Sequence, residues 1–155
     1  GVEIVQVQTA AEMLEKVIDC LPCDVAICAA AVSDWMMKTV AKDKIKKDKS
    51  LDYLNLKMVK TPDILKHISH SAPRPKLVVG FAAETMELEQ NALKKLESKS
   101  CDWILANDVN PEGGIMGGKE TQIILLSNEG KKTFPRMSKV DFANLLVNDI
   151  CTEFE

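Results

Sequence analysis

The stretch from Lys76 to Ala106, KLVVGFAAETMELEQNALKKLESKSCDWILA, decides the fold of this chain. Two apolar runs, Lys76 to Ala82 and Cys101 to Ala106, flank a segment that begins near Thr85 and carries glutamates early and lysines late. Those charges suit a helix, since acids are favourable at its amino end and bases at its carboxyl end. The stretch therefore predicts two buried strands joined by a helix, which is the unit of a parallel sheet.

The residues before this unit continue the alternation of strands and helices. Asp24 to Ala31, DVAICAAA, is almost continuously apolar and predicts a strand in the centre of the parallel sheet. Val2 to Val7 alternates apolar and polar residues and predicts another strand, and Thr9 to Glu12 then forms a capping box that opens a helix. Leu51 to Val59 alternates again, and Thr61-Pro62-Asp63 supplies an N-cap, a proline at the first helical position and an early acid.

The residues after the unit predict a hairpin and a last helix. Thr121 to Leu126 is a strand, Asn128 to Gly130 a turn, and Lys131 to Phe134 the returning strand. Ser138 then caps an amphipathic helix. Strands alternating with helices predict an α/β fold, Rossmann-like, with a mainly parallel three-layer sheet and an added β-hairpin. We expect residues 1–155 to form one domain.

Composition excludes several classes of protein. The chain has 155 residues, 46% of them hydrophobic and 28% charged, as in an ordinary globular domain. A formal charge of −3 argues against a general affinity for nucleic acid, which needs a basic face. No run approaches the roughly 20 apolar residues of a membrane span, and no signal peptide opens the chain. We therefore expect a cytoplasmic protein with reduced cysteines.

A lysine-rich segment follows the DVAICAAA strand. Lys38 to Lys49, KTVAKDKIKKDK, holds six lysines and two aspartates in twelve residues. Such a run is usually a solvated surface loop. Ligands of open α/β sheets, however, bind beyond the carboxyl ends of strands, so the alternative is a cationic flap over a polyphosphate. Asp34, three residues past the strand, is placed to meet a ribose hydroxyl or a metal.

Three further motifs carry weaker signals. Cys20-Leu21-Pro22-Cys23 has redox spacing, but it follows a helix, so no helix amino end is available to lower a thiol pKa. The same cysteines with His67 and His70 match no standard zinc finger, and we expect no metal site. Gly113 to Glu120, GGIMGGKE, nearly spells a phosphate-binding loop, but the required Ser/Thr is a glutamate and a strand follows. A dinucleotide-dependent oxidoreductase would need a G-x-G-x-x-G loop, which the chain lacks.

Five ordered motifs together resemble a known family. They are AAAVSDW (29–35), KIKK (44–47), TPDIL (61–65), VGFAAET (79–85) and ANDV (106–109). They are similar to those of bacterial phosphopantothenate-cysteine ligase, the synthetase half of the bifunctional coenzyme A biosynthesis flavoprotein. The resemblance implies that CTP activates the carboxylate of 4'-phosphopantothenate as an acyl-cytidylate, releasing pyrophosphate. The amine of L-cysteine then displaces CMP and forms the amide. Mg²⁺ and lysines would neutralise the triphosphate.

The resemblance also implies roles for individual residues. Lys44 looks like the flap lysine that contacts the phosphates and supports acyl-cytidylate formation, which makes it the expected catalytic residue. Phe81 resembles an apolar contact to the nucleotide, while Lys95 and Lys99, four apart on one helical face, match two further nucleotide-binding lysines. The remaining nucleotide-binding positions implied are Cys28, Ala29, Ala30, Asp34, Pro62, Asp63, Ile64 and Leu65.

Some positions depart from the family pattern. Met36 stands where relatives often carry arginine, which leaves any substrate contact there unsupported, and Asn107 and Asp108 could meet either the base or the substrate. Relatives also have a Gly/Ser/Thr-rich strand and loop that would precede Gly1, and farther upstream an FMN-dependent decarboxylase domain. We expect these 155 residues to lack both, to bind no FMN and to form a homodimer. The alternative to a ligase is a non-catalytic nucleotide-binding or dimerisation fragment of that enzyme.

Overall fold

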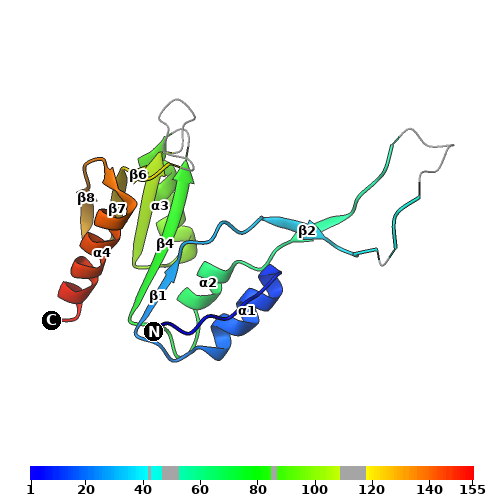
Figure 1. Ribbon diagram of the computed structural model, residues 1–155, viewed down its shortest axis with the longest axis horizontal. Helices are drawn as coiled ribbons and strands as arrows, with labels where there is room; N and C mark the ends of the chain where they lie inside the picture. The colour runs from blue at the N-terminus through cyan, green and yellow to red at the C-terminus, as the bar shows by residue number, and fades with distance from the viewer. Residues whose placement is uncertain (42, 47–52, 85–86, 109–117) are drawn as a thin grey trace. The chain divides into compact units, whose positions relative to one another are not determined.

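A computed structural model describes residues 1–41, 43–46, 53–84, 87–108 and 118–155 (Figure 1). The chain divides into two compact units. Unit 1 consists of Gly1–Cys20 and Ala31–Ile64, and unit 2 of Leu21–Ala30 and Leu65–Glu155. The assignment of residues 1–155 to a single domain remains a prediction.

Unit 2 is built on a five-stranded mixed sheet with the order β1-β4-β5-β7-β8. Strands β1, β4 and β5 are parallel to one another, whereas β7 is antiparallel to β5 and β8 is antiparallel to β7. The strands span Val25–Cys28 (β1), Leu77–Glu84 (β4), Trp103–Asp108 (β5), Ile123–Ser127 (β7) and Gly130–Thr133 (β8). The predicted α/β class and the added hairpin β7–β8 are therefore confirmed.

Helices cover both faces of this sheet, which gives three layers (Figure 1). Helix α4, Lys139–Glu153, packs Phe142 and Leu146 against the face that carries Leu77, Val79 and Trp103. Helix α3, Leu88–Lys99, joins β4 to β5 and buries Ala92 and Leu96 on the opposite side. The two faces arise because successive side chains of a strand point to opposite sides of the sheet.

The last helix begins where the sequence predicts. The Ser138 side chain accepts a hydrogen bond from the Asp141 backbone N–H at 3.0 Å, so it is the expected N-cap. The strand just before α4, β9 (Met137–Ser138), pairs antiparallel with β6 (Glu120–Thr121), which precedes the β7–β8 hairpin.

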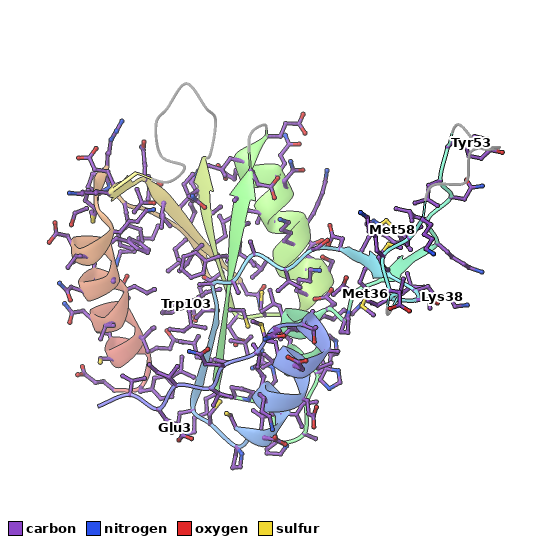
Figure 2. All side chains as sticks on the ribbon, turned by 45° about the vertical axis from the view of Figure 1, so that its right-hand side comes forward. Glu3, Met36, Lys38, Tyr53, Met58 and Trp103 are labelled. Carbon is purple, nitrogen blue, oxygen red and sulfur yellow. The ribbon has the colours of Figure 1, made fainter. Side chains whose placement is uncertain are left out.

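Unit 1 contains a helix and a hairpin. Helix α1, Ala10–Asp19, starts with the predicted capping box, in which Thr9 Oγ1 accepts from the Glu12 N–H at 3.1 Å. Strands β2, Trp35–Met37, and β3, Met58–Lys60, pair antiparallel with Met36 opposite Val59. Figure 2 labels Met36 and Met58 on this hairpin, in which the register partner of Met58 is Met37. Helix α2, Ile64–Ser69, starts at the last residue of unit 1.

Three predicted strands differ from the structure. Val2 to Val7 forms no strand, because these residues pair with no strand in the described part of the chain and all but Val7 are exposed. The DVAICAAA strand is shortened to Val25–Cys28, and it lies at the edge of the described sheet rather than in its centre, which leaves Ile27 48% exposed. Of Leu51 to Val59, the described residues enter a strand at Met58.

Candidate functional site

The carboxyl ends of β1, β4 and β5 form a stepped edge in unit 2. Cys28, Gly80 and Ile104 are register partners across these strands. Strand β1 stops at Cys28, whereas β4 and β5 continue for four more residues to the partners Glu84 and Asp108. The exposed Ala29 and Ala30 follow β1 at the step. An edge of this kind is where open α/β sheets bind their ligands.

Gly80 allows α2 to pack tightly on this edge. A Cβ atom on Gly80 would come within 2.5 Å of Leu65 Cδ2 and 2.8 Å of Ile104 Cδ1. Both distances are shorter than a normal van der Waals contact, so Leu65 covers bare backbone of β4. The predicted ligand residue Leu65 therefore has a packing role in unit 2.

Cys28 and Phe81 lie on opposite faces of the sheet. Cys28 shares its face with Gly80, its register partner, whereas Phe81 is the next residue of β4 and points the other way, where it packs half-buried against the core beneath α4. Burial raises the pKa of the Cys28 thiol, so this cysteine is a neutral packing group. One ligand can meet both positions only by lying over the end of the sheet.

Lys95 is held by an acid at the end of β4. Its Nζ lies 2.7 Å from Glu84 Oε1, and the Glu84 side chain is 17% exposed against 42% for Lys95. Lys99 is the last residue of α3, one turn farther along. Because α3 runs back from the carboxyl edge of the sheet to the start of β5, Lys99 lies farther from that edge than Lys95.

The remaining predicted residues belong to unit 1. Lys44 is exposed and lies outside any helix or strand, and Asp34 is exposed with its carbonyl accepting the Thr61 N–H at 2.9 Å. Pro62 is half-buried, Asp63 exposed and Ile64 buried.

The start of α2 corrects a sequence prediction. The helix begins at Ile64 rather than at Pro62. Thr61 does not act as its N-cap, because Thr61 Oγ1 is buried and makes no hydrogen bond among the described residues. The chain therefore enters the helix two residues later than the Thr-Pro-Asp pattern predicts.

The lysine-rich segment extends the β2–β3 hairpin at its start. The Lys38 N–H donates to the Lys57 carbonyl at 2.9 Å, and the Lys46 side chain is exposed like that of Lys44. Residues 42 and 47–49 of the segment lie outside the described residues. Exposed lysines fit a solvated loop and a phosphate flap equally well, so both interpretations stand.

The cysteine, histidine and glycine motifs gain no support from the described residues, and their chemistry stays untested. All five cysteines are described, and Cys20, Cys28, Cys101 and Cys151 are free thiols. Within the described ranges no three His, Cys, Asp or Glu residues gather as metal ligands. Residues 113–117 of GGIMGGKE lie outside these ranges, and strand β6 begins at Glu120, the last residue of the motif, so a strand rather than a helix comes next as predicted. Among the described helices none is long and apolar enough to cross a membrane.

Two side-chain clusters escaped the sequence analysis. The first is the Glu84–Lys95 pair, whose members lie eleven residues apart on a strand and a helix. The second lies at the amino ends of β4 and β5. There Asp102 accepts hydrogen bonds from Arg74 Nη2 at 2.9 Å and from the Val78 N–H at 2.7 Å. Strand–helix–strand geometry brings these residues together. Glu84 lies in the VGFAAET motif and Lys95 was expected to bind the nucleotide, but no local sequence pattern predicts that they pair.

Comparison with known proteins gives one consistent family. The family model described as the DNA/pantothenate metabolism flavoprotein C-terminal domain matches residues 1–154. The coenzyme A biosynthesis bifunctional protein CoaBC of Vibrio vulnificus is 36% identical over 153 residues, which are 98% of this chain and 38% of the relative. The protein of the same name from Bacillus subtilis is 38% identical over 150 residues, 96% of this chain and 36% of the relative.

A solved structure shares the same fold. The crystal structure of the C-terminal domain of a coenzyme A biosynthesis bifunctional protein CoaBC superposes with a TM-score of 0.74 at 30% identity. The match covers 97% of this chain and 65% of the solved one. The chain thus spans less than two fifths of the length of the curated relatives it matches.

Proposed function

The chain belongs to the family of the DNA/pantothenate metabolism flavoprotein C-terminal domain, and on that premise we propose that it joins 4'-phosphopantothenate to L-cysteine in coenzyme A biosynthesis. The observation that carries the proposal is the 36–38% identity, over almost the whole chain, to relatives named for coenzyme A biosynthesis. The carboxyl edge of β1, β4 and β5 supports it, since this is where such a sheet binds a nucleotide.

The proposed reaction has two steps. A carboxylate oxygen of 4'-phosphopantothenate attacks the α-phosphorus of CTP, and pyrophosphate leaves. The amine of cysteine then attacks the acyl carbon of the acyl-cytidylate, CMP leaves with the bonding electron pair, and the ammonium proton passes to solvent. Both steps demand alignment of reactants and compensation of phosphate charge, which a protein supplies with fixed backbone N–H groups and cations.

Lys44 and Lys95 are the cations that we assign to CTP. Lys44 is proposed to contact the phosphates during formation of the acyl-cytidylate. Lys95, on α3, is proposed to contact them from its position beside Glu84 at the end of β4. Mg²⁺ would supply further charge compensation. In nucleotide sites Mg²⁺ is usually held by substrate phosphates and water together with one or two carboxylates.

Substitution of Lys44 tests the proposal. Lys44→Gln should lower the rate of pyrophosphate release from CTP and 4'-phosphopantothenate by about 100- to 1,000-fold, the usual effect of removing one group that stabilises the transition state. Lys46→Gln is the matched control, because Lys46 is an equally exposed lysine two residues away. The assay uses the natural protein that carries this sequence. Equal rates for both variants would remove Lys44 from the mechanism.

The second candidate function is nucleotide binding or dimerisation without catalysis. The carboxyl edge of β1, β4 and β5 suits it as well as it suits a ligase, since nucleotide binding alone needs no catalytic residue. Calorimetric titration of the 155-residue chain with CTP, beside a turnover assay of the same sample, separates the two candidates. CTP binding without product formation would support the non-catalytic function for this chain.

A further inference from the structure

The Glu84–Lys95 ion pair differs from a typical surface pair in its burial. Glu84 is the last residue of β4 and its side chain is 17% exposed, whereas the Lys95 side chain is 42% exposed. The acid therefore lies deeper than the base, and the 2.7 Å contact points the ammonium group of Lys95 towards the end of the strand. Most surface ion pairs have two mobile, solvated partners.

The burial of Glu84 makes the pair difficult to separate. If the Lys95 ammonium left, a partly buried carboxylate would lose its countercharge, which is unfavourable. A ligand at this edge consequently meets Lys95 where Glu84 holds it. Since an ammonium group has three N–H donors and Glu84 Oε1 accepts one, the group retains donors for an anion.

We propose that Glu84 is a positioning residue, which fixes Lys95 at the carboxyl edge of β4 so that its ammonium group binds the phosphates of the nucleotide. This inference rests on the proposed function, because it deepens the role of Lys95 in CTP binding. Protein kinases use the same principle, in which a glutamate paired with the phosphate-binding lysine must be in place for activity. Here the acid is on the strand and the base on the helix.

A second acid–lysine pair of unit 2 offers a matched control. Lys132 Nζ lies 2.6 Å from Asp149 Oδ2, and the Asp149 side chain is 26% exposed, close to the value for Glu84. Asp149 lies on α4, which packs on the sheet face opposite α3. Asp149→Asn therefore removes a similar charge from a similar pair without touching Lys95.

Calorimetry of CTP binding in the presence of Mg²⁺ tests the inference on the 155-residue chain. Glu84→Gln should raise the Kd about tenfold, the value of one charge-assisted hydrogen bond, while Asp149→Asn leaves it within about twofold. Glu84→Asp, which retains the charge, should restore most of the affinity. Lys95→Gln should weaken binding by a similar factor, and the double variant Glu84→Gln/Lys95→Gln should bind no worse than Lys95→Gln alone.

The double variant separates positioning from support of the fold. A merely structural Glu84 would weaken binding equally with and without Lys95, and that result would overturn the inference. An unchanged Kd for Glu84→Gln would also overturn it, as would tighter binding, since tighter binding means that the carboxylate repels the nucleotide. If the wild-type chain itself does not bind CTP, the proposed function of the chain fails together with the inference.

Discussion

Asp102→Ala should lower the free energy of unfolding of unit 2 by about 2–4 kcal/mol, because one carboxylate holds two segments of the chain. Asp102 Oδ2 accepts the backbone N–H of Val78 at 2.7 Å. The same carboxylate accepts Arg74 Nη2, at 3.0 Å to Oδ1 and 2.9 Å to Oδ2. Arg74 in turn donates to the carbonyls of Ser69 and Pro75, both at 2.9 Å.

The two interactions of Asp102 contribute unequally. The Val78 N–H is partly buried, so losing its charged acceptor costs about 1.5–3 kcal/mol. The Arg74 and Asp102 side chains are 32% and 35% exposed. Because solvent screens their ion pair, it should contribute only about 0.5–1 kcal/mol to the free energy of unfolding. Asp102→Asn preserves an oxygen for Val78 and loses the ion pair, so it should cost about 1 kcal/mol.

Urea denaturation followed by circular dichroism measures these differences, provided that the m-value stays constant among the variants. Glu120→Gln is the control. The Glu120 carboxylate also forms an ion pair with an arginine, Arg136, but both of these side chains are more than half exposed. This variant should lower the free energy of unfolding by less than about 1 kcal/mol. The reasoning is refuted if Asp102→Asn is as damaging as Asp102→Ala, since the charge rather than the Val78 acceptor would then dominate.

Two further predictions concern packing and thiol chemistry. Gly80→Ala should destabilise the protein by about 1–3 kcal/mol in the same denaturation assay, because the new Cβ would overlap Leu65 Cδ2 at 2.5 Å. Full stability of this variant would show that Leu65 can move aside. Burial raises the pKa of Cys101 to about 11, so at pH 8 about one thiol in a thousand is ionised in the folded state. Iodoacetamide should therefore label the exposed Cys151 well before Cys101, as mass spectrometry of the peptides would show, and equal labelling in the folded protein would contradict the buried thiol.

Much of the fold could be predicted from the sequence because local signals agree with the final packing. KLVVGFA and CDWILA are apolar on both faces, and both become central strands covered by helices. The hydroxyls of Thr9 and Ser138 cap helices where the local pattern predicts, since capping is a contact within four residues. Strand–helix–strand order then determines the parallel pairing.

The failures occurred where a strand depends on distant partners. Val2 to Val7 has the alternation of a strand. Alternation indicates which face is apolar, but it does not show whether a neighbouring strand is present to form hydrogen bonds. DVAICAAA is apolar on both faces, yet it lies at the edge of the described sheet, because strand order is a property of the whole chain. The family resemblance likewise assigned a role to Lys95 but none to Glu84, since the pair forms only after α3 folds back along β4.

In the β4–α3–β5 segment, the carboxylate that supports stability and the one assigned to binding lie at opposite ends of the strands. Arg74 and Asp102 join the amino ends of β4 and β5, where the Asp102 N–H also donates to the Val78 carbonyl at 2.9 Å. Glu84 and Lys95 stand at the carboxyl end of β4. The Asp102 carboxylate is bound by fixed partners within the chain, so its removal should lower the free energy of unfolding.

The Glu84 carboxylate holds an ammonium group that retains free N–H donors, so its removal should lower the affinity for an anion. Asp102 and Glu84 variants studied in parallel should therefore move different quantities, although both remove one negative charge from the same strand–helix–strand unit.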